Sequence, residues 1–375
     1  MDFDFSDDQK MLKDQAHRFL SEQCTTKAVR TVFEGEAHFD SGLWKQICEM
    51  GWTGTAIPES YGGLGLGYLE LCVIAEELGR ALAPVPFSST VYLFAEAILI
   101  AGSEDQKQRL LPKVAAGEII GTFARAEEPG AVVPKTIRTT LKSGKLNGRK
   151  IAVVDGPSAD FCVVLARASD QPGERGLQLA LVDLDGEGVT RAGCASIDAS
   201  RGYSEITFEN AAAEPLGAIG EGWSDQNRVL DRAAILMAFE QVGGADVCLA
   251  SATDYAKSRY AFGRQIGSYQ AIKHKLADMY VLNELARSNA YYGAWALSTD
   301  ASELPLAAAA ARVAATQAFD YAAKENVQTH GGIGFTWEAD CHLFYRRSRG
   351  LGLMLGAQRT WKEKLVTQLE LANAA

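Results

Sequence analysis

Four residues that could recognise a nucleotide lie close together between positions 254 and 280, in the run DYAKSRYAFGRQIGSYQAIKHKLADMY. They are Arg259, Phe262, Arg264 and Gln270. An arginine fork binds phosphate, and an aromatic ring or an amide edge binds a purine ring. On composition alone, a charged helical turn with one buried phenylalanine is the simpler interpretation.

This run is predicted to form two helices joined by a short break. Residues 254–260 continue a long helix, and Gly263 and Gly267 interrupt it because glycine weakens a helix and tolerates turn dihedrals. After the break, apolar residues recur at i, i+4 and i+7, which makes one apolar helix face. The candidate nucleotide-binding residues are therefore expected where the chain reverses.

A second candidate segment, residues 328–335, reads QTHGGIGF. Its adjacent glycines, Gly331 and Gly332, allow a backbone to approach a ligand closely. The structural alternative is a helix that ends with Gly331 as its C-terminal cap.

The first run, R-x-x-F-G-R-Q-I-G-x-x-Q-A-I-K-H-x-L-A-D-M, resembles the flavin-linked acyl-CoA dehydrogenase family. The Q-x-x-G-G-x-G-F segment, the loop I-P-E-x-Y-G-G-x-G at residues 57–65 and the run at residues 102–118 resemble the same family. The resemblance covers nearly the whole chain. It implies that one set of residues holds the ADP half of an FAD bound by the neighbouring subunit: Arg259, Phe262, Gln270, Gln328, Gly331 and Gly332.

Composition sets limits on the class of protein. The chain has 375 residues, 47% hydrophobic and 22% charged, which is typical of a globular protein with a large core. The net charge of −10 argues against nucleic acid or an anionic membrane as a partner. The acidic start MDFDFSDD is unlike a targeting peptide, and no apolar run is expected to span a membrane. Seven cysteines without CxxC spacing are typical of reduced thiols, so we expect a cytoplasmic protein.

The period of the apolar residues changes twice along the chain, from helix to strand near residue 121 and back to helix near residue 223. Strands are predicted at residues 137–141, 151–154, 161–165, 177–182 and 203–208, with turns at residues 143–144, 147–148 and 185–186. Together with the resemblance, this predicts an α+β, acyl-CoA dehydrogenase-like fold. Its parts are an N-terminal all-α domain (1–120), a middle β-barrel or sandwich domain (121–222) and a C-terminal four-helix bundle (223–375).

The resemblance also implies a reaction with clear chemical demands. A carboxylate removes the α-proton of an acyl-CoA thioester, the β-hydride passes to flavin, and the product is a 2-enoyl-CoA. Leu355 stands at the commonest position of this base and Ala233 at the alternative position, and neither can accept a proton. The nearest carboxylates are Asp231, interpreted as exposed beside Arg232, and Glu240, which lies in an apolar run. Glu240 is the outside candidate for a base, as a buried acid of raised pKa, although a structural ion pair is the simpler role.

Residues that hold the flavin ring in the family are replaced here. Where the family has T-E-P-G-x-G-S-D, Glu127 and Val133 take the place of hydroxyl donors. Where it has W-I-T-N-G, Ala152 replaces the tryptophan and Val154 replaces the threonine. A carboxylate beside the ring disfavours reduced flavin, and valine offers no hydrogen bond.

The chain thus has residues that could bind a neighbour's FAD. It lacks the residues that would bind its own flavin ring and the base that would remove the α-proton. We predict the accessory subunit of a heteromeric, α2β2 acyl-CoA dehydrogenase. Its partners would be a catalytic dehydrogenase chain, an acyl-CoA and an electron-transfer flavoprotein. The resemblance extends to two-chain enzymes that oxidise bulky acyl-CoAs, including steroid side chains.

Three alternatives remain at this point. A self-sufficient homo-oligomeric dehydrogenase would need Glu240 or Asp231 as its base. A flavin-dependent monooxygenase or nitroalkane-oxidase relative would consume oxygen. A non-catalytic scaffold would only stabilise its partner.

Overall fold

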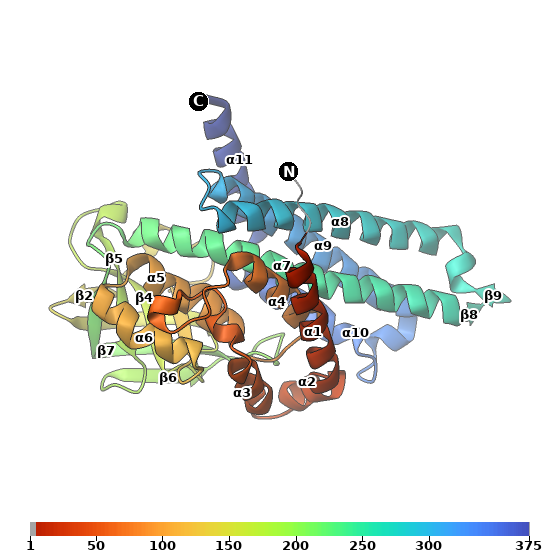
Figure 1. Ribbon diagram of the computed structural model, residues 1–375, viewed down its shortest axis with the longest axis horizontal. Helices are drawn as coiled ribbons and strands as arrows, with labels where there is room; N and C mark the ends of the chain where they lie inside the picture. The colour runs from red at the N-terminus through yellow and green to blue at the C-terminus, as the bar shows by residue number, and fades with distance from the viewer. Residues whose placement is uncertain (1–4, 375) are drawn as a thin grey trace. The chain divides into compact units, whose positions relative to one another are not determined.

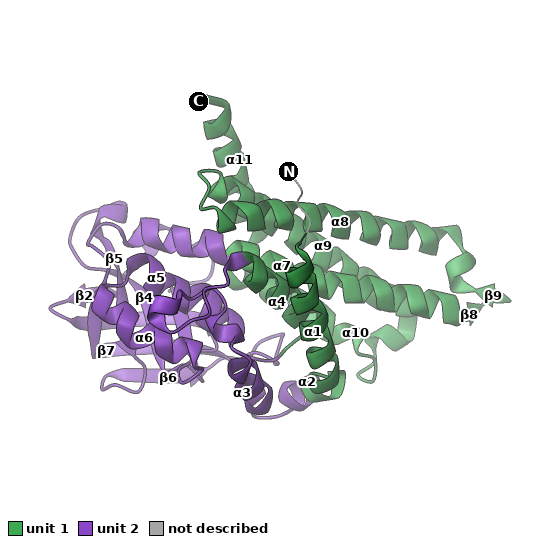
Figure 2. Cartoon of the chain, viewed as in Figure 1, with its two compact units in different colours: residues 1–29, 69–83, 234–375 green, residues 30–68, 84–233 purple. Residues whose placement is uncertain are grey.

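The structure is a computed structural model that describes residues 5–374. Its contacts divide the chain into two compact units, each built from separate segments (Figure 2). Unit 1 comprises residues 1–29, 69–83 and 234–375, and unit 2 comprises residues 30–68 and 84–233. The three-domain division at residues 120 and 222 stays a prediction.

Helices dominate both ends of the chain (Figure 1). The α-helices are α1 (Asp7–Gln23), α2 (Thr26–Glu34), α3 (Ser41–Glu49), α4 (Tyr68–Arg80), α5 (Glu96–Ala101), α6 (Glu104–Ala115), α7 (Gly222–Ser258), α8 (Gln270–Ser298), α9 (Leu304–His330), α10 (Cys341–Met354) and α11 (Gln358–Ala374). The strands are β1 (Gly121–Ala124), β2 (Thr140–Lys142), β3 (Lys145–Val154), β4 (Phe161–Arg167), β5 (Leu177–Asp183), β6 (Val189–Gly193), β7 (Tyr203–Leu216), β8 (Tyr260–Ala261) and β9 (Arg264–Gln265).

The sequence contains the local signals that begin two of these helices. Ser6 caps α1 and Ser103 caps α6, and each serine side chain accepts a hydrogen bond from the backbone of the glutamine three residues later. Each glutamine side chain accepts one in return from the serine backbone, which completes a capping box. These contacts satisfy N–H groups that the first helical turn leaves unpaired.

Unit 2 contains a seven-stranded sheet that closes on itself. The strand order is β1-β4-β2-β3-β7-β5, β6 pairs with β7, and β4 also pairs with β5. Because β4 pairs with β2 on one side and β5 on the other, five strands form a ring. Buried apolar side chains fill it, among them Leu146, Val164, Val182, Ile206 and Phe208. The predicted β-barrel is therefore observed.

Three details of the β region differ from the prediction. Strands β1 and β6 were not predicted, because β1 has only four residues and β6 carries little apolar alternation. The Asn147-Gly148 pair is not a turn: both residues lie inside β3, where the register shifts between Leu146 and Gly148. Gly148 has a φ of +144° there, which an irregularity in a strand tolerates only with glycine.

The apolar segment at residues 88–101 is helical, but only its second part is an α-helix. Residues Ser88–Ala95 form a π-helix, which continues directly into α5. A π-helix of two turns is rare, and such segments are frequent near functional sites.

In unit 1, α8 and α9 run along each other, and α10 and α11 pack against α9. Helix α4 crosses α7 so closely that each contributes a glycine to the contact. A Cβ at Gly79 would lie 1.8 Å from the backbone oxygen of Glu240, and one at Gly243 would lie 1.9 Å from that of Glu76. Only a hydrogen fits at these two positions, so the two backbones touch.

By its length and composition, helix α7 could cross a membrane. No such segment was expected from the sequence. Yet 78% of its apolar window is buried within the protein, which is typical of a core helix.

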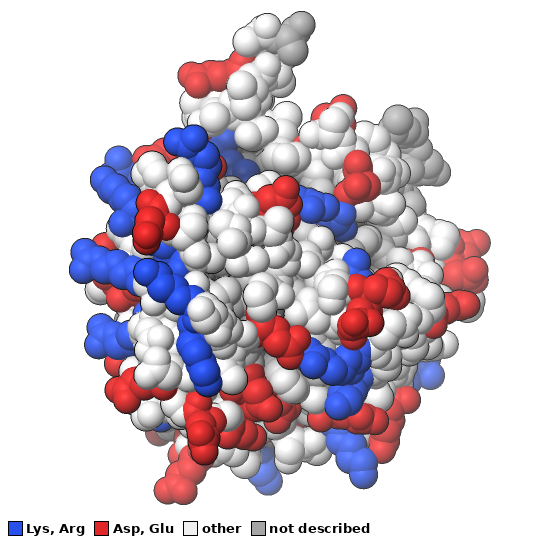
Figure 3. Space-filling view, turned by 90° about the vertical axis from the view of Figure 1, so that its left-hand side faces the viewer, with Lys and Arg blue, Asp and Glu red and all other residues white. Residues whose placement is uncertain are grey.

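On the face that Figure 3 shows, acidic and basic side chains of the described residues are mixed. That face offers no broad positive surface of the kind a nucleic acid requires.

We predict that Gly243→Ala lowers the free energy of unfolding by about 1–3 kcal/mol, because the new methyl group forces α4 and α7 apart. Denaturant unfolding followed by circular dichroism measures this. Gly352→Ala is the matched control, since its Cβ would lie 3.5 Å from Thr316 Cγ2, an ordinary contact. The control should leave stability unchanged or raise it by up to about 1 kcal/mol through helix propensity. Equal effects of both variants would contradict the close crossing.

Candidate functional site

The first candidate segment forms a hairpin that presents its tip to solvent. Strands β8 and β9 pair through Ala261 and Arg264, so the loop consists of Phe262 and Gly263. Both loop residues have positive φ, +52° and +81°, as a type I′ turn requires. A phenylalanine is strained in this region, and the side chain of Phe262 is 96% exposed. The expected break between two helices is thus observed, but its phenylalanine is not buried.

Residues beside the hairpin are exposed as well. Arg259, which follows the last residue of α7, and Gln270, at the start of α8, are both exposed. The backbone oxygen of Arg259 accepts a hydrogen bond of 2.8 Å from the N–H of Ile266, which holds the arginine at the base of the hairpin. The guanidinium of Arg264 instead lies over the ring of Tyr269, 4.0 Å from its centroid.

The second candidate segment lies at the C-terminal end of α9. Helix α9 ends at His330, and Gly331 follows as its cap with a φ of +64°. A Cβ at Gly331 or Gly332 would meet no atom within 4 Å, so both backbones are open to a ligand. Gln328 is exposed one turn earlier. The cap and the ligand-approach interpretations of Gly331 are therefore compatible.

A ring contact brings the two segments to the same end of unit 1. The ring of Tyr255, near the end of α7, stacks on that of His330 with centroids 4.2 Å apart. An ion pair of 2.7 Å between Lys275 on α8 and Glu325 on α9 adds a second link. Cation, amide and open glycine backbone are the groups that a nucleotide with a pyrophosphate needs.

The two positions at which the resemblance predicts a base are buried and apolar. Ala233 on α7 is fully buried, and Leu355, which follows α10, is buried as well. Asp231 is buried, not exposed as expected, and it takes part in an interaction within the chain. Neither of the two predicted base positions therefore carries a carboxylate.

Glu240 is the counterion of a buried cation. It is 4% exposed, and its Oε1 lies 3.8 Å from Nη1 of Arg347, which is also buried. Arg347 donates a further hydrogen bond of 3.2 Å to the carbonyl of Leu82. Burial lowers the pKa of nearby Arg312 to about 9, and the charge of Glu240 opposes that shift. The contacts favour the structural role of Glu240 over that of a base.

Glu127, at the predicted flavin-ring position, forms hydrogen bonds within the chain. Its carboxylate accepts hydrogen bonds from the N–H groups of Arg138 and Thr139, at 2.7 and 3.0 Å, and from Nζ of Lys150 at 2.7 Å. Burial raises the pKa of Glu127, but the Lys150 charge and these bonds outweigh it and hold the pKa below the usual value. Burial lowers the pKa of Lys150 to about 8 against the charge of Glu127. The carboxylate that was predicted to lie beside a flavin ring forms an ion pair with Lys150.

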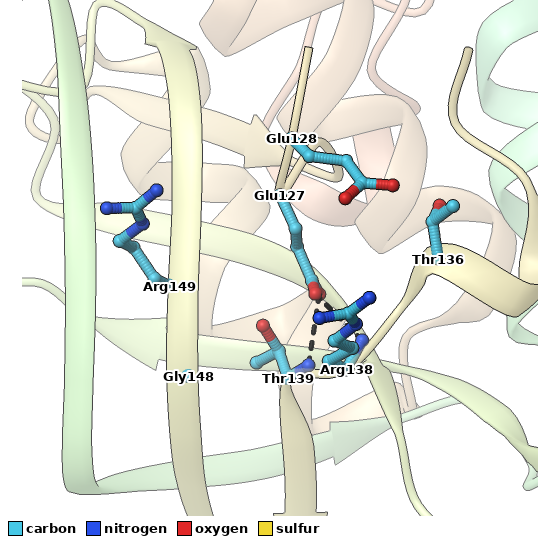
Figure 4. A pocket seen from close by; sticks show the side chains of 7 residues that line it. All are labelled: Glu127, Glu128, Thr136, Arg138, Thr139, Gly148 and Arg149. Atoms are coloured by element: carbon cyan, nitrogen blue, oxygen red, sulfur yellow. Dashed lines mark hydrogen bonds between the residues drawn. The ribbon is translucent and has the colours of Figure 1, made fainter. Parts of the chain in front are cut away.

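A cavity of about 220 Å³ opens beside this ion pair (Figure 4). Its lining mixes both signs of charge with hydroxyl groups: Glu127, Glu128, Thr136, Arg138, Thr139, Gly148 and Arg149. Glu127, in the segment that follows β1, points toward Arg138 and Thr139, as the dashed bonds in Figure 4 show. Such a lining does not provide the apolar cover that a flavin ring needs.

Comparisons with known proteins decide the family. The model of the acyl-CoA dehydrogenase N-terminal domain matches residues 6–118, and that of the C-terminal domain matches residues 220–366. The chain belongs to the acyl-CoA dehydrogenase family. Acyl-CoA dehydrogenase IpdE2 of Mycobacterium tuberculosis is 32% identical over 366 residues, covering 97% of this chain and 98% of that protein.

Solved structures agree with that assignment. A variant of the steroid ACAD Tcur3481-Tcur3483 has a TM-score of 0.88 and 28% identity, over 98% of this chain and 99% of that one. The ChsE4-ChsE5 complex from Mycobacterium tuberculosis has a TM-score of 0.88 and 25% identity, over 99% of both chains. The predicted family and α+β fold are thereby confirmed. FAD is the cofactor of this family, and its activity is the oxidation of acyl-CoA.

The residues of this acyl-CoA dehydrogenase fit one half of FAD better than the other. The exposed groups at the ends of α7 and α9 suit the ADP half, with Arg259 for phosphate and Gly331 and Gly332 for close backbone approach. The side chains of Val133 and Val154 carry no hydrogen-bond donor for the ring. The predicted assignment of each of these residues stays a prediction.

The sequence interpretation missed a second buried acid, Glu96. In unit 2 its Oε2 accepts a hydrogen bond of 3.1 Å from the hydroxyl of Tyr68 and lies 3.9 Å from Nη1 of Arg232. Burial raises the pKa of Glu96 to about 7, against the charge of Arg232 and the Tyr68 hydrogen bond. A lone acid in an apolar run was the signal that drew attention to Glu240, and it applies equally to Glu96.

We predict that Glu240→Gln lowers the free energy of unfolding by about 3–5 kcal/mol, because Arg347 is left as an uncompensated buried charge. Denaturant unfolding of the purified chain tests this. Glu363→Gln is the control, since Glu363 forms an exposed pair of 2.9 Å with Arg359, and its loss should cost less than about 1 kcal/mol. A Glu240→Gln protein of unchanged stability that has lost turnover would instead favour the base.

We predict that the stability of the chain depends on pH through Glu96. Because its pKa in the folded state is raised from 4.5 to about 7, the folded protein binds this proton more tightly than the unfolded chain. Stability is therefore lost as pH rises from 4.5 to about 7, by at most about 1.4 kcal/mol per pH unit. Glu96→Gln removes this slope. If the unfolding free energies of the unaltered chain and of Glu96→Gln change in parallel with pH, the pH dependence does not come from Glu96.

Proposed function

We propose that this chain is the accessory subunit of a heteromeric acyl-CoA dehydrogenase. The observation that carries the proposal is a contrast within one chain. The groups suited to the ADP half of FAD face outward, whereas the two base positions hold the buried side chains of Ala233 and Leu355. A chain of this kind lends contacts to a flavin that another chain holds.

The strained tip of the hairpin supports this proposal. Phe262 is 96% exposed in a backbone conformation that disfavours it. Contact with water stabilises neither an exposed aromatic ring nor a strained backbone. Such a residue therefore gains its stabilising contact from a partner. The catalytic subunit would supply that contact, together with the flavin ring and the carboxylate.

The assembly that follows is α2β2, with a second dehydrogenase chain as the catalytic subunit. In it, FAD would supply the hydride acceptor, and the partner's carboxylate would take the α-proton. The partner's acyl-CoA would be bulky and of steroid type, in line with the steroid ACAD among the similar structures and with the two-chain ChsE4-ChsE5 complex. We further propose an electron-transfer flavoprotein as the acceptor and the cytoplasm as the location.

The first test compares absorbance spectra of the chain purified alone and after co-expression with a neighbouring dehydrogenase chain. A colourless, inactive chain that becomes yellow only in the complex supports the proposal. A yellow single chain that an acyl-CoA bleaches would overturn it.

We predict that Arg259→Ala strips FAD from the complex and leaves the subunits associated. Loss of one charged phosphate contact weakens FAD binding by about 1.5–3 kcal/mol, or at least tenfold. The FAD content after gel filtration, read beside the elution volume, measures both effects. Lys257→Ala is the matched control, since Lys257 is also exposed near the end of α7. A complex that keeps its FAD with Arg259→Ala would indicate a scaffold that makes no contact with the cofactor.

A further inference from the structure

The cavity beside Glu127 in unit 2 is lined in part by a buried hydroxyl group that makes no hydrogen bond. Thr139 lines this cavity and is 1% exposed, and its Oγ1 has no partner among the residues that the structure describes. The hydroxyl of Thr136, which also lines the cavity, instead donates to the carbonyl of Val133 at 2.9 Å. Buried hydroxyl groups are mostly hydrogen-bonded, because an unpaired one loses its bonds to water without compensation. The Thr139 hydroxyl therefore points to a partner from outside the chain.

The size of the cavity limits what that partner is. Its volume of about 220 Å³ is far above the roughly 10–15 Å³ that one water needs, and below the roughly 300–1,000 Å³ of pockets for drug-sized ligands. On the side of β3, Gly148 lies against Thr139, and a Cβ at Gly148 would come within 2.6 Å of the hydroxyl oxygen. Glycine thus leaves the hydroxyl without a side chain over it on that side. The cavity suits a molecule smaller than a flavin or a coenzyme A.

Two of the four charged side chains that line the cavity lack an ion pair. Glu127 is neutralised by its lysine partner at 2.7 Å, and Nη1 of Arg149 lies 3.3 Å from Oε1 of Glu205. The guanidinium of Arg138 and the carboxylate of Glu128 are exposed and form no ion pair with any residue that the structure describes. The cavity therefore offers one unpaired charge of each sign beside the hydroxyl (Figure 4).

These three groups define the chemistry of the ligand. An arginine fork binds a carboxylate, and a threonine hydroxyl can donate a further hydrogen bond to it. The Glu128 carboxylate only accepts hydrogen bonds, so it requires a donor such as an ammonium group. A simple anion would be repelled by Glu128, and a simple cation by Arg138. A molecule with both charges satisfies all three groups.

We propose that this cavity binds a small amino acid, with its carboxylate on Arg138 and the Thr139 hydroxyl and its ammonium group on Glu128. Such a ligand would link the segment after β1 to the segment before β2. The residues of the site all belong to unit 2, and the site requires neither FAD nor acyl-CoA. The outcome of its test is therefore independent of the accessory role.

The test uses the purified full-length chain, and its probes are glycine, β-alanine and 4-aminobutyrate, which hold the two charges at increasing separations. Acetate and methylammonium, with one charge each, are the comparison. Isothermal titration gives the Kd, and thermal unfolding gives an independent signal, since a ligand of the folded state raises the unfolding temperature. At least one amino acid should bind about tenfold more tightly than acetate and methylammonium. Acetate binding as tightly as the best amino acid would indicate a simple anion site and overturn the proposal, as would no binding of the three amino acids.

Thr139→Val removes the hydroxyl and keeps the shape of the side chain. It should weaken binding of the best amino acid about tenfold, as expected for a lost hydrogen bond to a charged group. Without ligand, it should be as stable as the unaltered chain, because the hydroxyl has no partner to lose. Thr140→Val is the matched control, since Thr140 is the next residue and does not line the cavity. Normal binding by Thr139→Val would overturn the proposal.

Arg138→Gln and Glu128→Gln each remove one of the unpaired charges. Each should weaken binding of the amino acid by about three- to fivefold, a modest effect because both side chains are exposed. Lys135→Gln is the control, because Lys135 is an exposed cation nearby that does not line the cavity. Unchanged binding in either variant would overturn the assignment of two charges. If circular dichroism shows that the isolated chain is unfolded, the co-expressed complex is titrated and judged by the same outcomes.

Discussion

The backbone contact between α4 and α7 determines how charge is arranged in unit 1. Because Gly79 and Gly243 have no side chains, each helix lies against the other's carbonyl groups. Glu76 is buried at this crossing, and its Oε1 lies 2.9 Å from Nζ of Lys13 and 2.8 Å from Nη1 of Arg287. Burial raises the pKa of Glu76, but these two cations outweigh it and keep the pKa below the ordinary value. Helices α1 and α8 are thereby held to α4 through charges that cannot be moved apart without leaving one of them buried and unpaired.

The same constraint separates a counterion from a catalytic base. A base must change its protonation state during turnover, whereas a counterion must keep its charge as long as its partner is buried. Glu240 lies at the crossing and faces Arg347, so a proton on Glu240 would leave the arginine uncompensated. Glu96 differs from Glu76 in the direction of its pKa, because burial dominates over Arg232 at Glu96, whereas Lys13 and Arg287 outweigh burial at Glu76. Burial alone therefore does not identify a catalytic acid, and the partner decides the direction of the pKa.

Local patterns predicted much of the fold and part of the site. The capping box at Ser6, the helix break at Gly263 and the succession of strands in the β region follow from residue types over short spans. The closed barrel was expected from the family resemblance. Long-range contacts were beyond such patterns. Lys150, 23 residues away in the chain, turns Glu127 from a free charge into an ion pair, and nothing in the sequence around Glu127 indicates this. The register shift at Gly148 likewise depends on the partner strand β7, so the Asn-Gly pair was mistaken for a turn.

The two halves of the candidate site depend on different parts of the chain. The outward-facing half presents its side chains on a backbone framework: positive φ at Gly263 and Gly331, a two-residue hairpin, and a helix end held by the Tyr255–His330 stack. Such features survive as long as the helices pack. The inward half depends on single side chains, and one substitution at position 233 or 355 is enough to remove a base. The backbone framework of the outward-facing half therefore does not depend on which side chains occupy positions 233 and 355.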